Sequence, residues 1–216
     1  GIGGGLRYET APFKKFQIGV SGYFVYNLAS SNLGKRDETT NALNRYEIGL
    51  FDIEDPYNKK DLDRLEELFI RYYLKKGSIT IGKQILRTPF INPQDGRMRP
   101  TLLEGIWLLV KPAKGMQVEG GWIYAISPRS TTRWFKVCES IGVYPTGLNP
   151  DGTTSGYKNV LNSKGIALIQ FTLKKTSGWT FLLMNQFTEN IFNTAFAQVD
   201  YDWKAKGNTW KIALQY

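Results

Sequence analysis

Apolar and polar residues alternate along much of the chain, which is the pattern of β-strands that face a different environment on each side. Residues 16–28 are the clearest example, with Phe16 and Ile18 on one face and Gln17 on the other. The same period recurs in 116–124, 179–188, 197–204 and 210–216. We count about ten such segments and predict an all-β, antiparallel fold.

The connections between these segments are of two alternating kinds. Short polar turns rich in Pro, Gly and Lys fall at 11–15, 75–77, 112–115, 174–178 and 204–207. Much longer connections fall at 29–63, 87–100 and 127–162, with a brief one near 189–193. Tight hairpins at one end and long loops at the other are typical of a β-barrel that crosses a membrane.

A soluble β-sandwich or barrel that binds sugar or protein is the alternative, because its strands also alternate around a buried apolar core. Two observations favour the membrane barrel. The opposite strand faces carry Arg, Glu, Gln and Asp in mid-strand, and the apolar faces carry aromatic residues near strand ends, as interfacial girdles do. These aromatic residues are Trp107, Trp122, Tyr124, Trp179, Tyr201, Trp203, Trp210 and Tyr216.

One stretch has two interpretations. Leu62, Leu65 and Phe69 follow helical spacing and lie near acidic residues, so residues 61–69 could begin as a helix. The alternation that follows favours a strand, and we predict a strand over 66–75.

The composition excludes several classes of protein. The 216 residues contain no histidine and a single cysteine, Cys138, which removes histidine-based triads, histidine-ligated zinc and an internal disulfide. The longest apolar stretches, 105–110 and 165–169, are far shorter than the roughly 20 residues of a membrane helix. We find no carboxylate cluster spaced for catalysis, so we expect no enzyme activity, no metal and no cofactor.

Two further signals have simpler explanations. Residues 77–83 match the start of a phosphate-binding loop, but Gln84 stands where a Ser or Thr must reach the magnesium ion, and the residues between alternate as a strand. The net charge of +9 does not predict nucleic-acid binding, because the lysines concentrate in the hairpin turns.

The charges on polar strand faces and in long connections are the candidate site residues. In an aqueous passage, guanidinium groups would orient carboxylates, and facing carboxylates would hold cationic groups. The candidates for lining the pore or guiding a substrate are Arg7, Glu67, Arg71, Arg87, Arg97, Arg99 and Glu119. The alternative is that they only solvate a lumen or pair with one another. The small or polar inward residues Gly19, Ser21, Gly121 and Thr180 would leave room for water.

Residues 82–105 combine a Thr88-Pro89 step, an Arg97-Met98-Arg99-Pro100 element and a strand that opens on Leu103-Glu104-Gly105. In this order they resemble the OprD family of outer-membrane porins. Residues 8–20 are similar to the first hairpin of that family, and residues 114–121 are similar to a later strand start. The resemblance covers most of the chain and weakens after Thr131.

The resemblance implies an 18-stranded transmembrane barrel in the bacterial outer membrane, monomeric or loosely trimeric. Such a barrel passes small polar solutes, often carboxylate-bearing, along an arginine ladder and through a pore narrowed by inward-folded loops. Arg97 and Pro100 match the family element directly, whereas Arg7, Arg71 and Arg87 are proposed from face and position only. Residues 127–162 fall where the constricting third loop would lie.

The expected organisation is a single β-barrel domain over residues 1–216, forming the N-terminal portion of a longer barrel; a complete barrel of about ten strands is the alternative. The expected partners are small polar solutes, outer-membrane lipid and lipopolysaccharide, with a homotrimer or other envelope proteins as candidates and no nucleic acid. The alternative function is a structural or partner-binding barrel of the cell envelope without an open pore.

Overall fold

The computed structural model describes residues 1–39, 41, 43–60, 62–93, 99–143, 147–158, 160–205 and 207–216, with the backbone only at 45 and 46. They form one antiparallel sheet with two four-residue helices in its connections. The elements are β1 (Ile2–Glu9), β2 (Phe16–Tyr26), α1 (Arg45–Ile48), β3 (Arg64–Leu74), β4 (Gly77–Gln84), β5 (Leu102–Val110), β6 (Met116–Ser127), β7 (Phe135–Lys136), α2 (Val137–Ser140), β8 (Ile166–Lys174), β9 (Trp179–Thr188), β10 (Phe192–Ala205) and β11 (Asn208–Gln215).

The strands lie side by side in chain order. The order is β1-β2-β3-β4-β5-β6-β8-β9-β10-β11, and the short β7 pairs with β6 beside this path. The expected all-β, antiparallel fold of about ten strands is therefore confirmed. Within the described residues β1 and β11 are the two edges and are not paired with each other, so these strands do not close into a barrel of their own.

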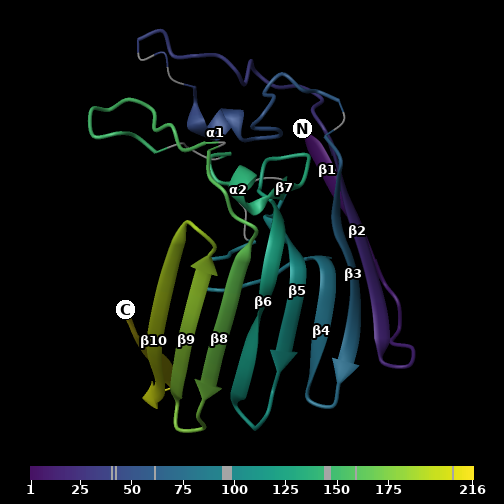
Figure 1. Ribbon diagram of the computed structural model, residues 1–216, viewed down its shortest axis with the longest axis vertical. Coiled ribbons are helices and arrows are strands. Elements are labelled where there is room, and N and C mark those ends of the chain that lie inside the picture. The colour runs from purple at the N-terminus through teal and green to yellow at the C-terminus, as the bar shows by residue number, and fades with distance from the viewer. Residues whose placement is uncertain are drawn as a thin grey trace.

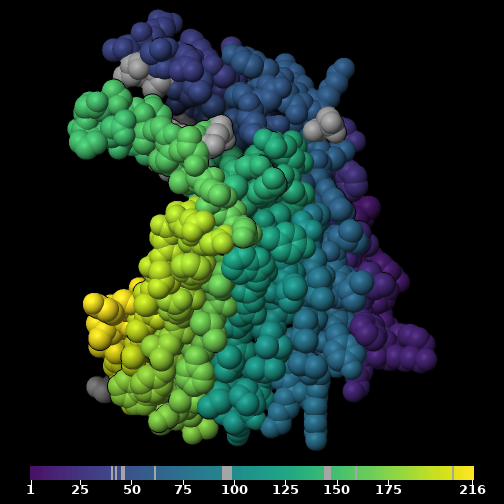
Figure 2. Space-filling model, viewed as in Figure 1, coloured from purple at the N-terminus to yellow at the C-terminus, as the bar shows by residue number. Residues whose placement is uncertain are grey.

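The two kinds of connection separate to opposite ends of the sheet, as the sequence predicts (Figure 1). The tight turns that join β1 to β2, β3 to β4, β5 to β6 and β8 to β9 lie at the lower end, whereas the short β9–β10 turn lies at the upper end. The first loop (residues 27–63), the second loop (85–101) and the third loop (128–165) all leave the strands at the upper end, and Figure 2 shows parts of the first and third loops above the strands. No helix in the described part of the chain is long and apolar enough to span a membrane.

Burial along the strands is inverted relative to a soluble protein. In β2, Phe16 and Ile18 are 52% and 49% exposed, whereas Gln17 and Ser21 are 8% and 7% exposed. β3, β4, β8 and β9 show the same inversion, so the outer face of this part of the sheet is apolar and its inner face is mostly polar. This is the arrangement of a wall between lipid and water, and it contradicts the soluble β-sandwich.

The outer face carries the expected aromatic residues near the hairpin turns of β9, β10 and β11. Trp179 contacts Tyr201 with ring centroids 4.6 Å apart, and Trp203 lies 5.7 Å from Tyr201 and 6.3 Å from Trp210. Trp107 is a correction to that set. It is only 5% exposed and packs in the apolar cluster on the inner face of β5, where it lies opposite Gly121 of β6.

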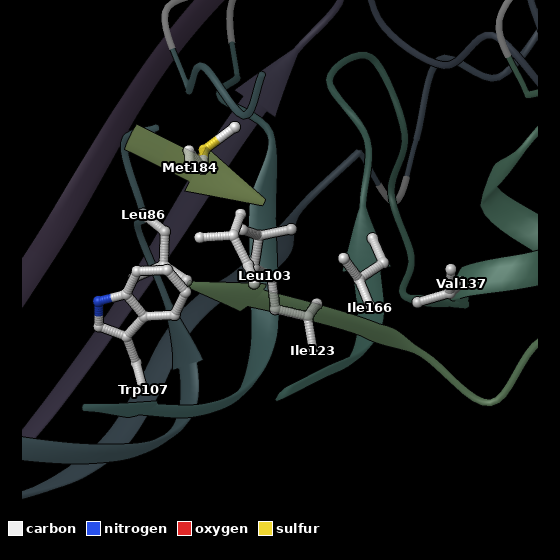
Figure 3. Packing of buried hydrophobic residues seen from close by; sticks show 8 residues of the cluster. Leu86, Leu103, Trp107, Ile123, Val137, Ile166 and Met184 are labelled. Carbon is white, nitrogen blue, oxygen red and sulfur yellow. The ribbon is translucent and has the colours of Figure 1, made fainter. Parts of the chain in front are cut away.

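The inner face also holds an apolar cluster, shown in Figure 3. Its wall residues come from β5, β6, β8 and β9, and they are Leu103, Trp107, Ile123, Ile166, Leu168 and Met184. Leu86 of the second loop and Val137 of α2 pack against them. Two of the three long loops are therefore anchored on the inner side of the wall.

The helical alternative for residues 61–69 is wrong, because β3 runs from Arg64 to Leu74. The helical spacing of the leucines arises from an irregularity in the strand. Ser21 of β2 lies opposite Glu67, and the next residue, Gly22, lies opposite Leu65. Glu66 is thus the extra residue of a β-bulge, which shifts the alternation by one position.

Candidate pore wall

Arg7 and Glu67 form an ion pair on the inner face of β1, β2 and β3. The Nε atom of Arg7 lies 2.6 Å from Glu67 Oε2, and its Nη2 atom lies 2.5 Å from Glu9 Oε1. Glu67 is 3% exposed and also accepts a hydrogen bond from Ser21. Because the Arg7 side chain is 54% exposed, one part of its guanidinium group faces the open side of the wall.

Arg71 lies lower on the same face. Its Nη1 donates to Gln17 Oε1 at 3.1 Å and its Nε donates to Thr80 Oγ1 at 3.2 Å. Its guanidinium carbon lies 4.6 Å from the centre of the Phe69 ring, in cation–π contact. These neutral partners fix the orientation of Arg71 and leave its positive charge uncompensated within the described residues.

Glu119 is the matching acidic feature on β6. Its Oε1 atom accepts hydrogen bonds from the side-chain amides of Gln117 and Gln170, both at 2.9 Å. Glu119 is half-buried, and no described cation pairs with it. Two neutral donors therefore orient a carboxylate that has no cationic partner among the described residues.

Asp200 on β10 was not among the expected site residues. It is 7% exposed, accepts from the Gln198 amide at 2.9 Å and 3.0 Å, and lies 3.3 Å from Lys211 Nζ. Its sequence signal is a glutamine two residues before a carboxylate on the same strand face. Gln198 and Asp200 show this spacing, and so do Gln117 and Glu119.

The sequence suggests that Gly19 leaves room for water, but in the structure the space beside it is occupied. A Cβ atom at this position would lie 2.3 Å from Phe69 Cζ, so the glycine makes space for the ring. Phe69 lies opposite Gly19 on β2 and opposite Gly82 on β4, and it is only 2% exposed. The aromatic ring lies over the backbone of Gly19 and fills part of the inner face.

The remaining candidates lie in the second loop. Arg99 is only 2% exposed and donates to the Phe51 carbonyl oxygen at 3.2 Å, so it joins two loops and does not face open solvent. Burial and the neighbouring Arg64 guanidinium lower the pKa of Arg99 to about 10, so it stays charged at neutral pH. Arg87 is exposed and makes no hydrogen bond or ion pair within the described part of the chain. Arg97 lies outside the described residues.

The described residues include no group of three or more His, Cys, Asp or Glu side chains that could hold a metal ion. Their inner face carries fixed charges, amides and hydroxyls beside the apolar cluster. The fold and this face together define a class of protein, the wall of an outer-membrane β-barrel with a polar lumen.

Comparison with known proteins agrees with this class. A family model described as outer membrane porin, OprD family, matches residues 34–216. The chain belongs to the OprD family. This confirms the family and the outer-membrane location expected from the sequence, and it places the chain among porins and not among enzymes. Comparison with curated proteins gives no significant match.

Solved porins share the fold. OpdK from Pseudomonas aeruginosa, crystallised with vanillate, superposes with a TM-score of 0.66 at 12% identity, covering 99% of this chain and 50% of that one. OccK9 (OpdG) from the same organism gives 0.69 at 14% identity, covering 99% and 49%. A BenF-like porin from Pseudomonas fluorescens Pf-5 gives 0.62 at 13% identity, covering 93% and 44%. The chain thus spans about half the length of these porins.

Proposed function

We propose that this chain forms part of the wall of a passive outer-membrane channel for small polar solutes. The observation that supports this most strongly is the inverted burial: apolar residues face outward, while Gln17, Ser21 and Glu67 line the inner face. A polar inner wall gives ions and solutes a hydrated path across the membrane. The ten main strands would then be one portion of a larger barrel, of which residues 1–216 form a single-domain segment.

The favoured solute bears a carboxylate. Arg7 and Arg71 point to the inner face, and Arg71 has no acidic partner among the described residues. Arg97 and Arg87 remain candidates in or beside the second loop. Vanillate, the aromatic carboxylate in the OpdK crystal structure, is a suitable first probe. A guanidinium group can hold such a carboxylate through two hydrogen bonds.

Loop packing supports a narrowed lumen. Val137 of the third loop and Leu86 of the second loop contact the inner wall, so both loops would restrict the passage on this side. Glu119 would repel carboxylates and attract cationic groups, which favours solutes that carry both a carboxylate and a hydrogen-bond donor. Contact with lipopolysaccharide and assembly into a homotrimer or with other envelope proteins are further expectations of the proposal.

The test is single-channel conductance of the full-length protein in a planar bilayer, with the reversal potential measured under a salt gradient. We expect discrete current steps, and Arg71→Gln should lower the anion preference. The control is Gln215→Asn on the exposed strand β11, which leaves the net charge unchanged. Gln215→Glu is unsuitable because it adds a negative charge. Arg97→Ala tests the remaining family-matched arginine in the same way.

A structural or partner-binding barrel without an open pore is the second candidate. The apolar inner cluster favours it, since Trp107, Leu168 and Met184 are bulky residues that fill space on the lumen side. The absence of current from protein that is folded in the bilayer would support this candidate and contradict the channel.

A further inference from the structure

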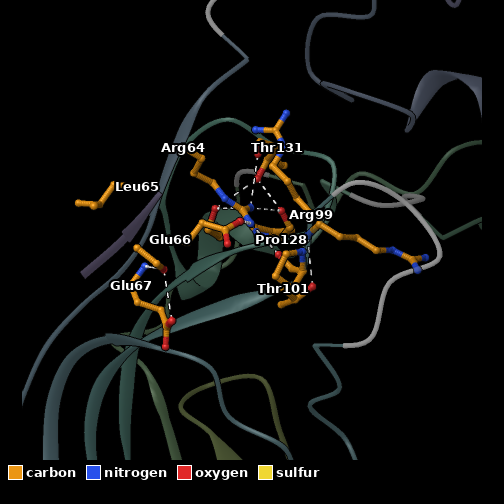
Figure 4. A network of polar contacts seen from close by, with 12 residues as sticks. Arg64, Leu65, Glu66, Glu67, Arg99, Thr101, Pro128 and Thr131 are labelled. Carbon is orange, nitrogen blue, oxygen red and sulfur yellow. Dashed lines mark hydrogen bonds and ion pairs between the residues drawn. The ribbon is translucent and has the colours of Figure 1, made fainter. Parts of the chain in front are cut away.

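Arg64 makes hydrogen bonds to several parts of the chain at the loop end of the sheet. It begins β3, its side chain is 1% exposed, and Figure 4 shows Glu66, Pro128 and Thr131 around it. Its Nη2 atom lies 2.9 Å from Glu66 Oε1 and donates to the Pro100 carbonyl oxygen at 2.7 Å. A single guanidinium group therefore binds its own strand and the second loop.

The other terminal nitrogen of Arg64 binds β6 and the third loop. Nη1 donates to Ser127 Oγ at 3.0 Å, to the Pro128 carbonyl oxygen at 3.2 Å and to the Thr131 carbonyl oxygen at 3.4 Å. The Ser127 hydroxyl in turn donates to the Arg133 carbonyl oxygen at 2.7 Å. Residues 127–133, which lead into the third loop, are thereby wrapped around the guanidinium group.

Further hydrogen bonds join the loops to one another at the same place. The Arg129 amide donates to Thr101 Oγ1 at 3.2 Å, which links the third loop to the second. The Ile53 amide donates to the Ser130 carbonyl oxygen at 2.8 Å, which links the first loop to the third. The three loops thus form one connected unit with Arg64 at its attachment to β3.

The segment held by Arg64 leads directly to the inner wall. Phe135 and Lys136 form β7 against β6, and Val137 follows in the apolar cluster. Only a few residues separate the Thr131 carbonyl oxygen from Val137, so the position of α2 depends on where residues 128–131 are fixed. A displacement at Arg64 would be transmitted to the part of the third loop that covers the wall.

We propose that Arg64 is a positioning residue that holds the second and third loops over the lumen and so sets the width of the passage. This inference rests on the proposed channel function. The chemistry requires arginine, because the planar guanidinium group offers five donors in a fixed arrangement and lysine offers three from one atom. The carbonyl acceptors and Glu66 surround Arg64 on several sides, which a single ammonium nitrogen cannot match.

The experiment measures single-channel currents of the full-length protein carrying Arg64→Lys, which keeps the charge beside Glu66. The control is Arg36→Met, since Arg36 lies in the first loop and is exposed, with one described hydrogen bond to the Asn41 carbonyl oxygen. Folding is checked by the heat-dependent shift in gel mobility. We expect Arg64→Lys to raise the mean conductance about twofold and to increase open-channel noise, because pore width controls conduction.

A second substitution tests whether Arg64 affects the passage through the third loop. Val137→Asp places a charge in the apolar cluster and should release α2 from the wall. If Arg64 acts through the third loop, Arg64→Lys should add little conductance or noise in the Val137→Asp background. Additive effects of the two changes would contradict this route.

The outcomes separate this inference from the proposed function. A folded wild-type protein that carries no current contradicts the channel itself. A conducting wild type with an Arg64→Lys variant of equal conductance and noise contradicts the role of Arg64 alone. If Arg64→Lys does not fold, Ser127→Ala removes one acceptor of Arg64 and the link to Arg133, and unchanged currents in that variant would also overturn the inference.

Discussion

Glu119→Gln gives the most direct test of the inner wall. The carboxylate accepts from two glutamine amides at 2.9 Å and has no described cationic partner. Glutamine has the same shape, so the substitution removes one negative charge with little change in packing. Both donors bind the same carboxylate oxygen, Oε1, so the amide oxygen of the new glutamine can accept both hydrogen bonds while its NH2 group takes the place of Oε2.

The magnitude follows from Coulomb's law. A cation that passes about 6 Å from the carboxylate gains about 1 kcal/mol at an effective dielectric constant of about 50. That energy corresponds to roughly a fivefold rise in the local cation concentration. Other charges of the wall act at the same time, so we expect the cation-to-anion permeability ratio to fall about two- to fivefold in Glu119→Gln.

The assay is the reversal potential under a potassium chloride gradient, with Glu38→Gln as the control. Glu38 lies in the first loop with its side chain 91% exposed. The Debye length shortens from about 10 Å at 0.1 M salt to about 3 Å at 1 M, so the effect should shrink at high salt. An unchanged permeability ratio at low salt, in a variant that folds and conducts, would refute the assignment of Glu119 to the permeation path.

Three further predictions concern packing. Gly19→Val should lower the free energy of unfolding by about 1–3 kcal/mol, because the new Cβ atom would overlap the Phe69 ring. The control Gly4→Ala should cost little, since a Cβ atom at Gly4 would meet open space. Urea titration of the folded protein in detergent measures both. Lys83→Met should lower the free energy of unfolding more than the double variant Lys83→Met/Glu104→Met does, because the single change leaves Glu104 without its ion-pair partner. Equal losses of unfolding free energy in the two variants would contradict this coupling. Val137→Asp should release α2 and raise protease cleavage in the third loop while the strands stay protected, with Val143→Asp in the same loop as the control.

The sheet could be predicted from the sequence because a local signal specifies it. Alternation fixes which residues of β2, β6 and β9 face outward, and the turn residues fix the hairpins. β1 was harder to predict, since Gly3, Gly4 and Gly5 give no alternation and the strand is identified only by its pairing with β2.

The site was predicted in part, and the misses have a common physical cause. Arg7, Glu67, Arg71 and Glu119 lie on the inner face because regular alternation places them there. Arg99 is buried between loops and Arg64 was not identified, because loop contacts over long sequence separations leave no periodic signal. The roles of Trp107 and Phe69 depend on glycines of neighbouring strands, which a single strand's pattern does not show.

The β-bulge at Glu66 explains how one strand serves both the wall and the loops. In regular alternation, Glu67 inside would place Glu66 toward the lipid and Arg64 with it. The extra residue turns Glu66 inward beside Glu67, so that both carboxylates are buried. Glu67 then pairs with Arg7 on the wall, while Glu66 pairs with Arg64 beneath the loops. One inserted residue thereby keeps Glu66 and Arg64 away from the membrane, and it joins the charged wall to the unit that holds the loops.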